Sequence, residues 1–159
     1  MRSTTLCLVI NEKGQLLLGR KKRGFGKGKW NGFGGKLEEG ETFLACAVRE
    51  LWEESGLKAK EEDLEAVGYL DFCFPYEPEL THDNWVYIVR NWTGDVQETT
   101  EMEPRWFDTD RLPFDRMWKG DRAWLPAMLK GKKIKGYVSF GRDNEEVEAM
   151  ELKEVDAFE

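Results

Sequence analysis

The sequence predicts an α/β (α+β) fold in which a mixed β-sheet carries a helix on each face. Short apolar segments rich in β-branched and aromatic residues recur along the chain and are bounded by turn residues, as is typical of strands. Only two segments have the pattern of a helix, residues 42–55 and residues 121–130. One sheet with a helix on either side buries all of these apolar surfaces, so an α/β/α sandwich is the expected architecture.

The chain is expected to form a single domain, 1–159, in the cytoplasm. It has 159 residues, of which 40% are hydrophobic, and it shows neither repeats nor a linker. No apolar run approaches the ~18 residues of a membrane span, and the first residues lack the pattern of a signal peptide. The net charge of −7 argues against a nucleic-acid polymer as partner. Without a coiled coil or an obvious apolar patch, a monomer is expected.

The cysteine and histidine content excludes several kinds of site. Cys7, Cys46 and Cys73 form no CxxC pair, so zinc is not indicated and free, mostly buried thiols are expected. His82 is the only histidine, which removes His-ligated metals and His-paired triads from consideration. It falls in a polar, proline-containing stretch, and we expect it to be an exposed loop residue.

The first 30 residues predict a hairpin followed by a basic loop. Residues 4–10 and 15–19 are apolar strands, and residues 11–14 form the turn between them. Residues 20–29 (RKKRGFGKGK) then hold six basic residues and no acidic one. Lysines here can hold a phosphate chain. The alternatives are a solvated loop or a nuclear localisation signal.

The first helix, residues 42–55, has recognisable ends. Thr42 can cap its N-terminus and Gly56 can occupy the left-handed position after its last turn. Leu44, Val48 and Leu51 recur at helical spacing and are expected to face the core.

Three carboxylates share another face of this helix. Glu50, Glu53 and Glu54 stand at i, i+3 and i+4, where like charges repel one another. A divalent cation such as Mg²⁺ removes that repulsion, because carboxylate oxygens are its preferred ligands. The alternative is that these side chains are only a solvated helix face.

The second half of the chain continues the sheet. Residues 64–74, 85–92 and 105–107 are expected strands, separated by loops at 75–84 and 94–103 and followed by a turn at 110–113. Residues 121–130 are expected to be helical despite Pro126, which can shift or kink the start of the helix. Residues 137–141 and 145–151 form a closing hairpin.

Nine residues between Gly35 and Leu57 follow the spacing G-x5-E-x7-R-E-L-x-E-E-x-G-L. This pattern resembles the Nudix box, the signature of enzymes that hydrolyse nucleoside diphosphates linked to another group. The resemblance implies a Nudix-type α/β/α sandwich with a catalytic-loop helix and a C-terminal helix. The complete box also favours a metal site over a solvated helix face.

The resemblance extends beyond the box to the MutT-homologue members of the family, which remove oxidised purines from the nucleotide pool. It includes LLLGRKKRGFGKGKWNGFGGKLEEGET, FCFPYEPEL at 72–80, EMEPRWF at 101–107 and KIKGYVSF at 133–140. The implied reaction is Mg²⁺-dependent hydrolysis of 8-oxo-dGTP to 8-oxo-dGMP and pyrophosphate, with Mn²⁺ as a possible substitute for Mg²⁺.

The same resemblance implies the catalytic and metal-binding residues. The expected metal ligands are the side chains of Glu50, Glu53, Glu54 and Glu101 and the carbonyl group of Gly34. Glu54 is the expected general base, with Glu53 as the alternative. Arg49 is expected to orient one of the glutamates through charge-assisted hydrogen bonds.

A further set of residues is implied to bind the purine nucleoside triphosphate. Tryptophan offers the largest surface for stacking on a base, and an asparagine amide presents a donor and an acceptor to a base edge. For most aromatic residues, ordinary core packing is the alternative. The implied residues are Thr5, Lys21, Phe25, Asn31, Phe72, Phe74, Trp118, Asp121 and Trp124.

Gly120 departs from the pattern of these enzymes, which have two adjacent aspartates after the stacking tryptophan. Here only Asp121 remains. Neighbouring carboxylates share protons, so that one donates while the other accepts. We therefore expect oxidised guanine to be recognised and 2-oxo-dATP to be a poorer substrate. The alternatives are another Nudix substrate (a methylated purine triphosphate, a dinucleoside polyphosphate or a sugar nucleotide) and a non-catalytic nucleotide-binding module.

Overall fold

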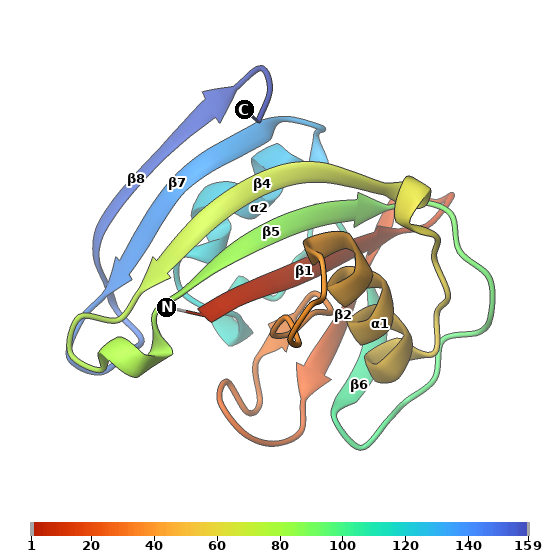
Figure 1. The fold of residues 1–159 in the computed structure, drawn as a ribbon, viewed down its shortest axis with the longest axis horizontal. Coiled ribbons are helices and arrows are strands. Elements are labelled where there is room, and N and C mark those ends of the chain that lie inside the picture. The colour runs from red at the N-terminus through yellow and green to blue at the C-terminus, as the bar shows by residue number, and fades with distance from the viewer. Residues whose placement is uncertain (1, 159) are drawn as a thin grey trace.

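A computed structural model of the chain describes residues 2–158. One mixed sheet of eight strands separates helix α1 from helix α2, which confirms the predicted sandwich (Figure 1). The strand order is β3-β2-β1-β5-β4-β7-β8, and β6 pairs with β2. The strands are β1 (Arg2–Ile10), β2 (Gln15–Lys21), β3 (Trp30–Asn31), β4 (Leu64–Cys73), β5 (His82–Val89), β6 (Met102–Asp108), β7 (Lys133–Phe140) and β8 (Val147–Val155). The helices are α1 (Phe43–Ser55) and α2 (Asp121–Leu129), with 3₁₀ turns at Glu61–Asp63, Pro78–Leu80 and Phe114–Arg116.

Strand β1 lies at the centre and pairs with β5 in parallel along almost its whole length, from Arg2 opposite His82 to Val9 opposite Val89. The predicted hairpin with β2 is present, but its antiparallel pairing is confined to the end next to the turn, at Val9 and Ile10. Strand β2 then leaves β1 and pairs with β6 and β3. The first half of β1 therefore has a free edge, which the glycine-rich segment before α1 occupies.

The sheet divides the core into two layers, because successive side chains of a strand point to opposite faces. Cys7 and Val9 pack with the apolar residues beneath α1, whereas Leu6 and Leu8 pack with those beneath α2. A strand buried on both faces needs a continuous apolar run, and residues 6–10 provide one.

Helix α1 begins and ends as predicted. Thr42 Oγ1 accepts a hydrogen bond from the backbone N–H of Ala45 at 3.1 Å, and Gly56 adopts φ 80° after the last turn. The predicted core stripe is only partly correct. Leu51 is buried, but Val48 is half-buried and lies outside the core cluster. Small residues, Cys46 and Ala47, are buried in its place, which allows the helix to lie close to the sheet.

Several predicted boundaries were wrong where long-range pairing extends a strand. Strand β7 begins at Lys133, because residues 134–139 pair in parallel with residues 68–73 of β4. Strand β5 begins at His82, so this histidine is a half-buried strand residue and not an exposed loop residue. Pro126 lies within α2, which ends at Leu129. Within residues 2–158, neither helix is long and apolar enough to cross a membrane.

Candidate active site

A glycine-rich segment, residues 33–37, lies along the free edge of β1. The backbone N–H of Thr5 donates to Gly35 O at 3.0 Å, and Cys7 and Phe33 exchange two backbone hydrogen bonds. A Cβ atom on Gly34 would lie 1.8 Å from Thr5 O, so no other residue fits in this backbone position. The close contact brings the Gly34 peptide next to the last turn of α1.

Glu54, in that last turn, is buried and its side chain reaches the glycine-rich segment. Its Oε1 accepts a hydrogen bond from the backbone N–H of Gly34 at 2.9 Å, and only 8% of the residue is exposed. Burial, together with the nearby charge of Glu50, raises the pKa of Glu54 to about 8, although the Gly34 N–H and Lys21 oppose the shift. Burial also raises the pKa of Glu50. Glu54 is thus buried beside a second carboxylate, and none of the ion pairs among residues 2–158 involves it.

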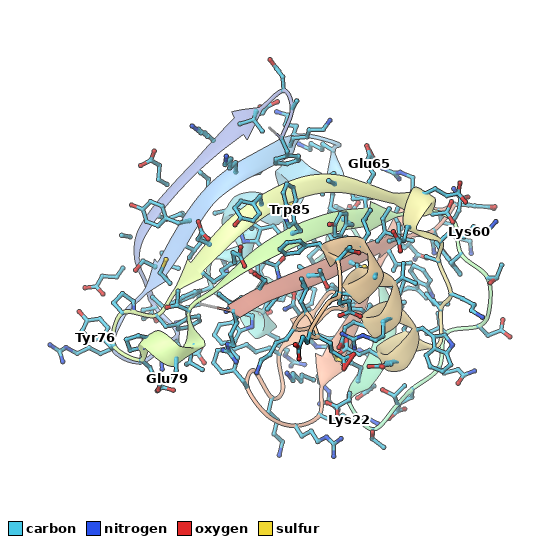
Figure 2. The ribbon with its side chains drawn as sticks, in the orientation of Figure 1. Lys22, Lys60, Glu65, Tyr76, Glu79 and Trp85 are labelled. Atoms are coloured by element: carbon cyan, nitrogen blue, oxygen red, sulfur yellow. The ribbon has the colours of Figure 1, made fainter. Side chains whose placement is uncertain are left out.

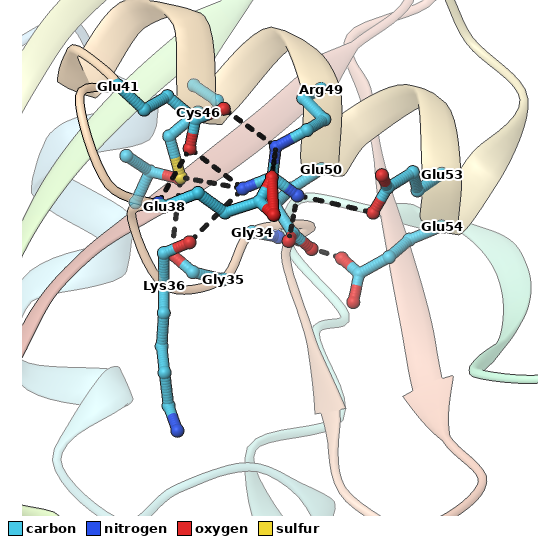
Figure 3. A network of polar contacts seen from close by, with 12 residues as sticks. Gly34, Gly35, Lys36, Glu38, Glu41, Cys46, Arg49, Glu50, Glu53 and Glu54 are labelled. Carbon is cyan, nitrogen blue, oxygen red and sulfur yellow. Dashed lines mark hydrogen bonds and ion pairs between the residues drawn. The ribbon is translucent and has the colours of Figure 1, made fainter.

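Arg49 connects the remaining carboxylates at the start and on the surface of α1 (Figure 3). Its Nε and Nη2 atoms donate to the two oxygens of Glu41 at 2.7 and 2.8 Å. Its Nη1 donates to Glu50 Oε1 at 2.6 Å and to Glu53 Oε2 at 3.3 Å. The hydrogen bonds from Arg49 lower the pKa of Glu41 to about 2. One guanidinium thus holds the side chains of Glu50 and of Glu41, which lies in the loop before the helix.

A cavity of about 390 Å³ opens beside Glu54 and Gly34. Its aromatic side is formed by three rings in mutual contact, with centroids 4.9 Å apart for Phe25 and Trp118 and 6.2 Å apart for Phe74 and Trp118. Nine residues expected to bind substrate or metal line this cavity: Thr5, Lys21, Phe25, Asn31, Gly34, Glu54, Phe72, Phe74 and Trp118. An aromatic compartment and a carboxylate therefore share one cavity.

Two expected substrate-binding residues do not line the cavity. Trp124 packs behind Phe72, with ring centroids 6.4 Å apart, and is 2% exposed. Asp121 follows Trp118 at the start of α2 and is 3% exposed. Asp121 Oδ2 and Trp124 Nε1 have no hydrogen-bond partner among residues 2–158. Both residues thus support the cavity wall from behind and hold unused hydrogen-bonding capacity there.

The buried Asp121 carboxyl should make stability depend on pH. Burial raises its pKa from 3.8 to about 8, so between these values the unfolded chain releases a proton that the folded chain retains. The free energy of unfolding should therefore fall as pH rises through this window, by up to about 1.4 kcal/mol per pH unit from this group. Asp121→Asn removes the titrating group. In urea unfolding, the unfolding free energy of this variant should therefore fall less from pH 5 to pH 8 than that of the wild type. Equal losses would contradict the burial argument.

The basic loop is largely neutralised by acidic residues that follow β5. Lys22 extends from the loop and pairs with Glu98 (Figure 2). Arg23 pairs with Glu101, and this contact lowers the pKa of Glu101. Arg20 and Lys29 likewise pair with Glu103 and Glu145. These ion pairs leave the loop with less unpaired positive charge than the sequence predicted. Lys21, at the start of the loop, lines the cavity.

The carboxylates fit a divalent cation in their chemistry, although arginines hold several of them in this arrangement. In the chain from residue 2 to residue 158, no three acidic, histidine or cysteine side chains already surround one point. The charge of Glu50 nevertheless makes Glu54 harder to ionise, and a cation that prefers hard oxygen ligands would relieve this. The ligand set stays a prediction.

The similarity of the chain to known proteins agrees with this geometry. The NUDIX domain family matches residues 1–128, which include β1, the glycine-rich segment and all of α1. The chain belongs to the Nudix family. It is 48% identical over 136 residues to the oxidized purine nucleoside triphosphate hydrolase of Danio rerio, covering 86% of this chain and 85% of that protein. It is 44% identical over 157 residues to the Mus musculus protein of the same name, covering 99% and 97%.

A solved Nudix-type structure also has the same fold. The MutT protein of Bacillus halodurans superimposes with a TM-score of 0.83 at 25% identity, covering 96% of this chain and 97% of that one. The nine residues of the Nudix box extend from the glycine-rich segment, which holds Gly35, through α1 to Leu57 just after it. Nudix hydrolases generally use a divalent metal, in agreement with the donor chemistry of this site.

The structure adds lining residues that sequence reasoning missed. His82 and Asn84 come from β5, whose first residues were expected to belong to a loop. Their signal was the alternation in which Asn84 precedes Val86 and Ile88 on one face of the strand. The other additions to the cavity wall are Arg2, Thr4, Leu6, Gly26, Lys29, Gly32, Gly35, Lys36, Met102 and Phe140.

Proposed function

We propose that this Nudix enzyme hydrolyses 8-oxo-dGTP to 8-oxo-dGMP and pyrophosphate. The observation that carries the proposal is that a single cavity joins an aromatic compartment to the buried carboxylate of Glu54. The names of the zebrafish and mouse relatives, oxidized purine nucleoside triphosphate hydrolases, support the same substrate class.

The base is proposed to stack on Trp118 with Phe25 and Phe74 at its edges. These rings already contact one another, so the stacking surface is formed before substrate binds. Base–aromatic stacking contributes about 1–3 kcal/mol. Asn31 and Thr5, which also line the cavity, are proposed to bond the polar edge of the base, with Asp121 behind Trp118 as a further acceptor.

Glu54 is proposed to accept the proton of the attacking water. Gly34 N–H occupies Oε1, which leaves Oε2 to take the proton. A pKa of about 8 suits a base that works near neutral pH. The phosphorus–oxygen bond to the pyrophosphate leaving group breaks as the water oxygen bonds to phosphorus.

The proposed ligands of Mg²⁺, or of Mn²⁺ in its place, are Glu50, Glu53, Glu54, the Gly34 carbonyl and Glu101. When bound, the cation supplies neutralisation of phosphate charge and a more acidic water. Arg23 holds Glu101 in this arrangement, so that ion pair has to open for Glu101 to take part. Lys21, which lines the cavity, is proposed to bind the phosphate or sugar side of the nucleotide.

The deciding experiment compares four substrates with Mg²⁺: 8-oxo-dGTP, 2-oxo-dATP, O6-methyl-dGTP and dGTP. We expect kcat/KM for 8-oxo-dGTP to exceed that for dGTP by at least about tenfold, equivalent to about 1.4 kcal/mol in the transition state. Equal values would mean that the cavity does not read the oxidised base. Faster hydrolysis of O6-methyl-dGTP would favour the alternative of a methylated purine substrate, and no pyrophosphate release would favour a binding module.

Gly120 is the feature that bears on 2-oxo-dATP. Aspartate at this position would restore the pair of carboxylates, but a Cβ on Gly120 would lie 2.9 Å from Val138 Cγ1. We therefore expect Gly120→Asp alone to destabilise the protein by about 1–3 kcal/mol without that gain. In Gly120→Asp with Val138→Ala, the carboxylate has room beside Asp121, and relative kcat/KM for 2-oxo-dATP should rise. Val138→Ala alone is the matched control, and no gain in the double variant would contradict the role of the paired carboxylates.

We propose further that the enzyme works as a monomer in the cytoplasm. The cysteines at 7, 46 and 73 are free thiols, which suits a reducing compartment. Sedimentation at the concentration of the assay tests the oligomeric state.

A further inference from the structure

Asn84 is a buried polar residue at the wall of the cavity. It lies in the first half of β5, on the face that carries the buried side chains of Val86 and Ile88, and only 6% of it is exposed. Strand β5 runs beside β1 (Figure 1), and in their register Asn84 stands opposite Thr4. Both residues line the cavity.

A chain of hydrogen bonds determines which way the Asn84 amide points. The Thr4 hydroxyl donates its single proton to the backbone carbonyl of Asp83 at 2.7 Å. Towards Asn84 the same hydroxyl can then only accept, and Asn84 Nδ2 donates to it at 2.7 Å. The amide nitrogen is thereby directed to Thr4, and the amide oxygen is directed away from it.

The Asn84 oxygen has no partner. Among residues 2–158, no donor bonds the buried Oδ1 atom of this cavity-lining residue. Buried polar atoms are normally paired, and an unpaired one at a cavity wall is satisfied when a ligand brings the missing donor. The neighbouring His82 does not supply it, because its Nδ1 bonds the backbone carbonyl of Leu80 at 2.7 Å.

We propose that Asn84 determines specificity by accepting a hydrogen bond from N7–H of the oxidised purine, with Thr4 as its positioning residue. The inference rests on the proposed function. Position N7 of an ordinary purine is an acceptor. Oxidation at C8 places a carbonyl there and a proton on N7, which turns that acceptor into a donor. A fixed acceptor in the wall attracts the oxidised base and faces a second acceptor when the base is undamaged.

An amide suits this task better than a carboxyl group. Asp121, which lies behind Trp118, can donate or accept according to its protonation, so it can adapt to either form of a base. Asn84 has no proton to gain or lose near neutral pH, and Thr4 prevents it from rotating to present its nitrogen. The discrimination it provides is therefore the same at every working pH.

The test measures binding of 8-oxo-dGMP and dGMP to the whole protein by calorimetry, without catalysis. Asn84→Leu has a similar shape and lacks the acceptor. We expect it to weaken 8-oxo-dGMP binding at least about tenfold and to leave dGMP binding within about twofold, since a site loses most when a buried group is left unpaired. An equal loss for both nucleotides, or no loss for either, would overturn the proposal.

Thr4 provides a second pair of variants in case Asn84→Leu folds poorly. Thr4→Val removes the hydroxyl that holds the amide, so the amide can rotate and offer Nδ2 to N7 of dGMP. The preference for 8-oxo-dGMP should then fall at least about fivefold, mainly through tighter dGMP binding. Thr4→Ser keeps the hydroxyl and should retain the preference. Equal preference in Thr4→Val and Thr4→Ser would overturn the positioning role.

This design separates the two proposals. Failure of the proposed function is an absence of pyrophosphate release from 8-oxo-dGTP by the wild type. Failure of the specificity inference is a binding preference that does not change in Asn84→Leu, whether or not the wild type releases pyrophosphate.

Discussion

Glu54→Gln should lower kcat for 8-oxo-dGTP by at least about 100-fold, because the amide cannot accept the proton of the attacking water. The substitution keeps the shape of the side chain and the acceptor for the Gly34 N–H, so the glycine-rich segment should stay in place. KM should change far less than kcat, because the rings proposed to bind the base lie elsewhere in the cavity.

The fall in kcat should be specific to the loss of the Glu54 carboxylate. Glu62→Gln, at an exposed position in the 3₁₀ turn before β4, is the matched control and should retain wild-type turnover. Steady-state kinetics on both variants, with circular dichroism to check folding, makes the comparison. A turnover number unchanged in Glu54→Gln would exclude it as the base and leave Glu53 as the candidate.

Arg49→Ala should reduce both stability and activity. It removes the one cation that holds Glu41, Glu50 and Glu53 together, and leaves their charges uncompensated at the start and on the surface of α1. Removing one partner of a buried ion pair costs about 3–5 kcal/mol. Because the Arg49 side chain is 23% exposed, we expect a smaller loss, about 2–3 kcal/mol.

Urea unfolding at two pH values tests the cause of that loss. The pKa of Glu41 is lowered to about 2 in the folded protein, against an ordinary value of 4.5. A carboxyl group whose pKa is lowered on folding stabilises the fold when the pH is above its pKa in the unfolded chain. This contribution is lost as the pH falls towards its pKa in the folded protein. The difference in unfolding free energy between wild type and Arg49→Ala should therefore be smaller at pH 3 than at pH 6. The control Arg111→Ala, at an exposed residue, should have the wild-type unfolding free energy at both pH values. A gap that is constant with pH would point to lost packing.

The sheet and both helices could be predicted from local patterns, because capping residues and apolar runs act over short distances. Thr42 and Gly56 are such signals, and both lie where the sequence placed them. Predicted strand boundaries were wrong where a strand is extended only by pairing with another strand that is distant in the sequence. The lysine-rich start of β7 has no strand pattern of its own, and its parallel pairing with β4 supplies the missing preference.

The candidate site likewise has a part that local patterns predict and a part that depends on long-range strand pairing. Arg49 and Glu53 stand four residues apart on α1, so their contact follows from helical spacing alone. Thr4 and Asn84 lie 80 residues apart and meet only through the register of β1 and β5. No local pattern encodes that register, although the alternation of Asn84 with Val86 and Ile88 indicates the face of the strand on which Asn84 lies. The sequence shows that Gly120 departs from the family pattern, but it does not show that a side chain at this position would collide with Val138.

The alternation of side chains along β1 has a consequence for protein engineering. Leu6 and Leu8 face the α2 layer, which holds the aromatic side of the cavity, whereas Cys7 and Val9 face the α1 layer, whose helix carries the carboxylates. The two sets of side chains share only the backbone of the strand. A substitution at Leu6 or Leu8 can therefore reshape the wall beside the rings while the packing beneath α1 keeps its contacts.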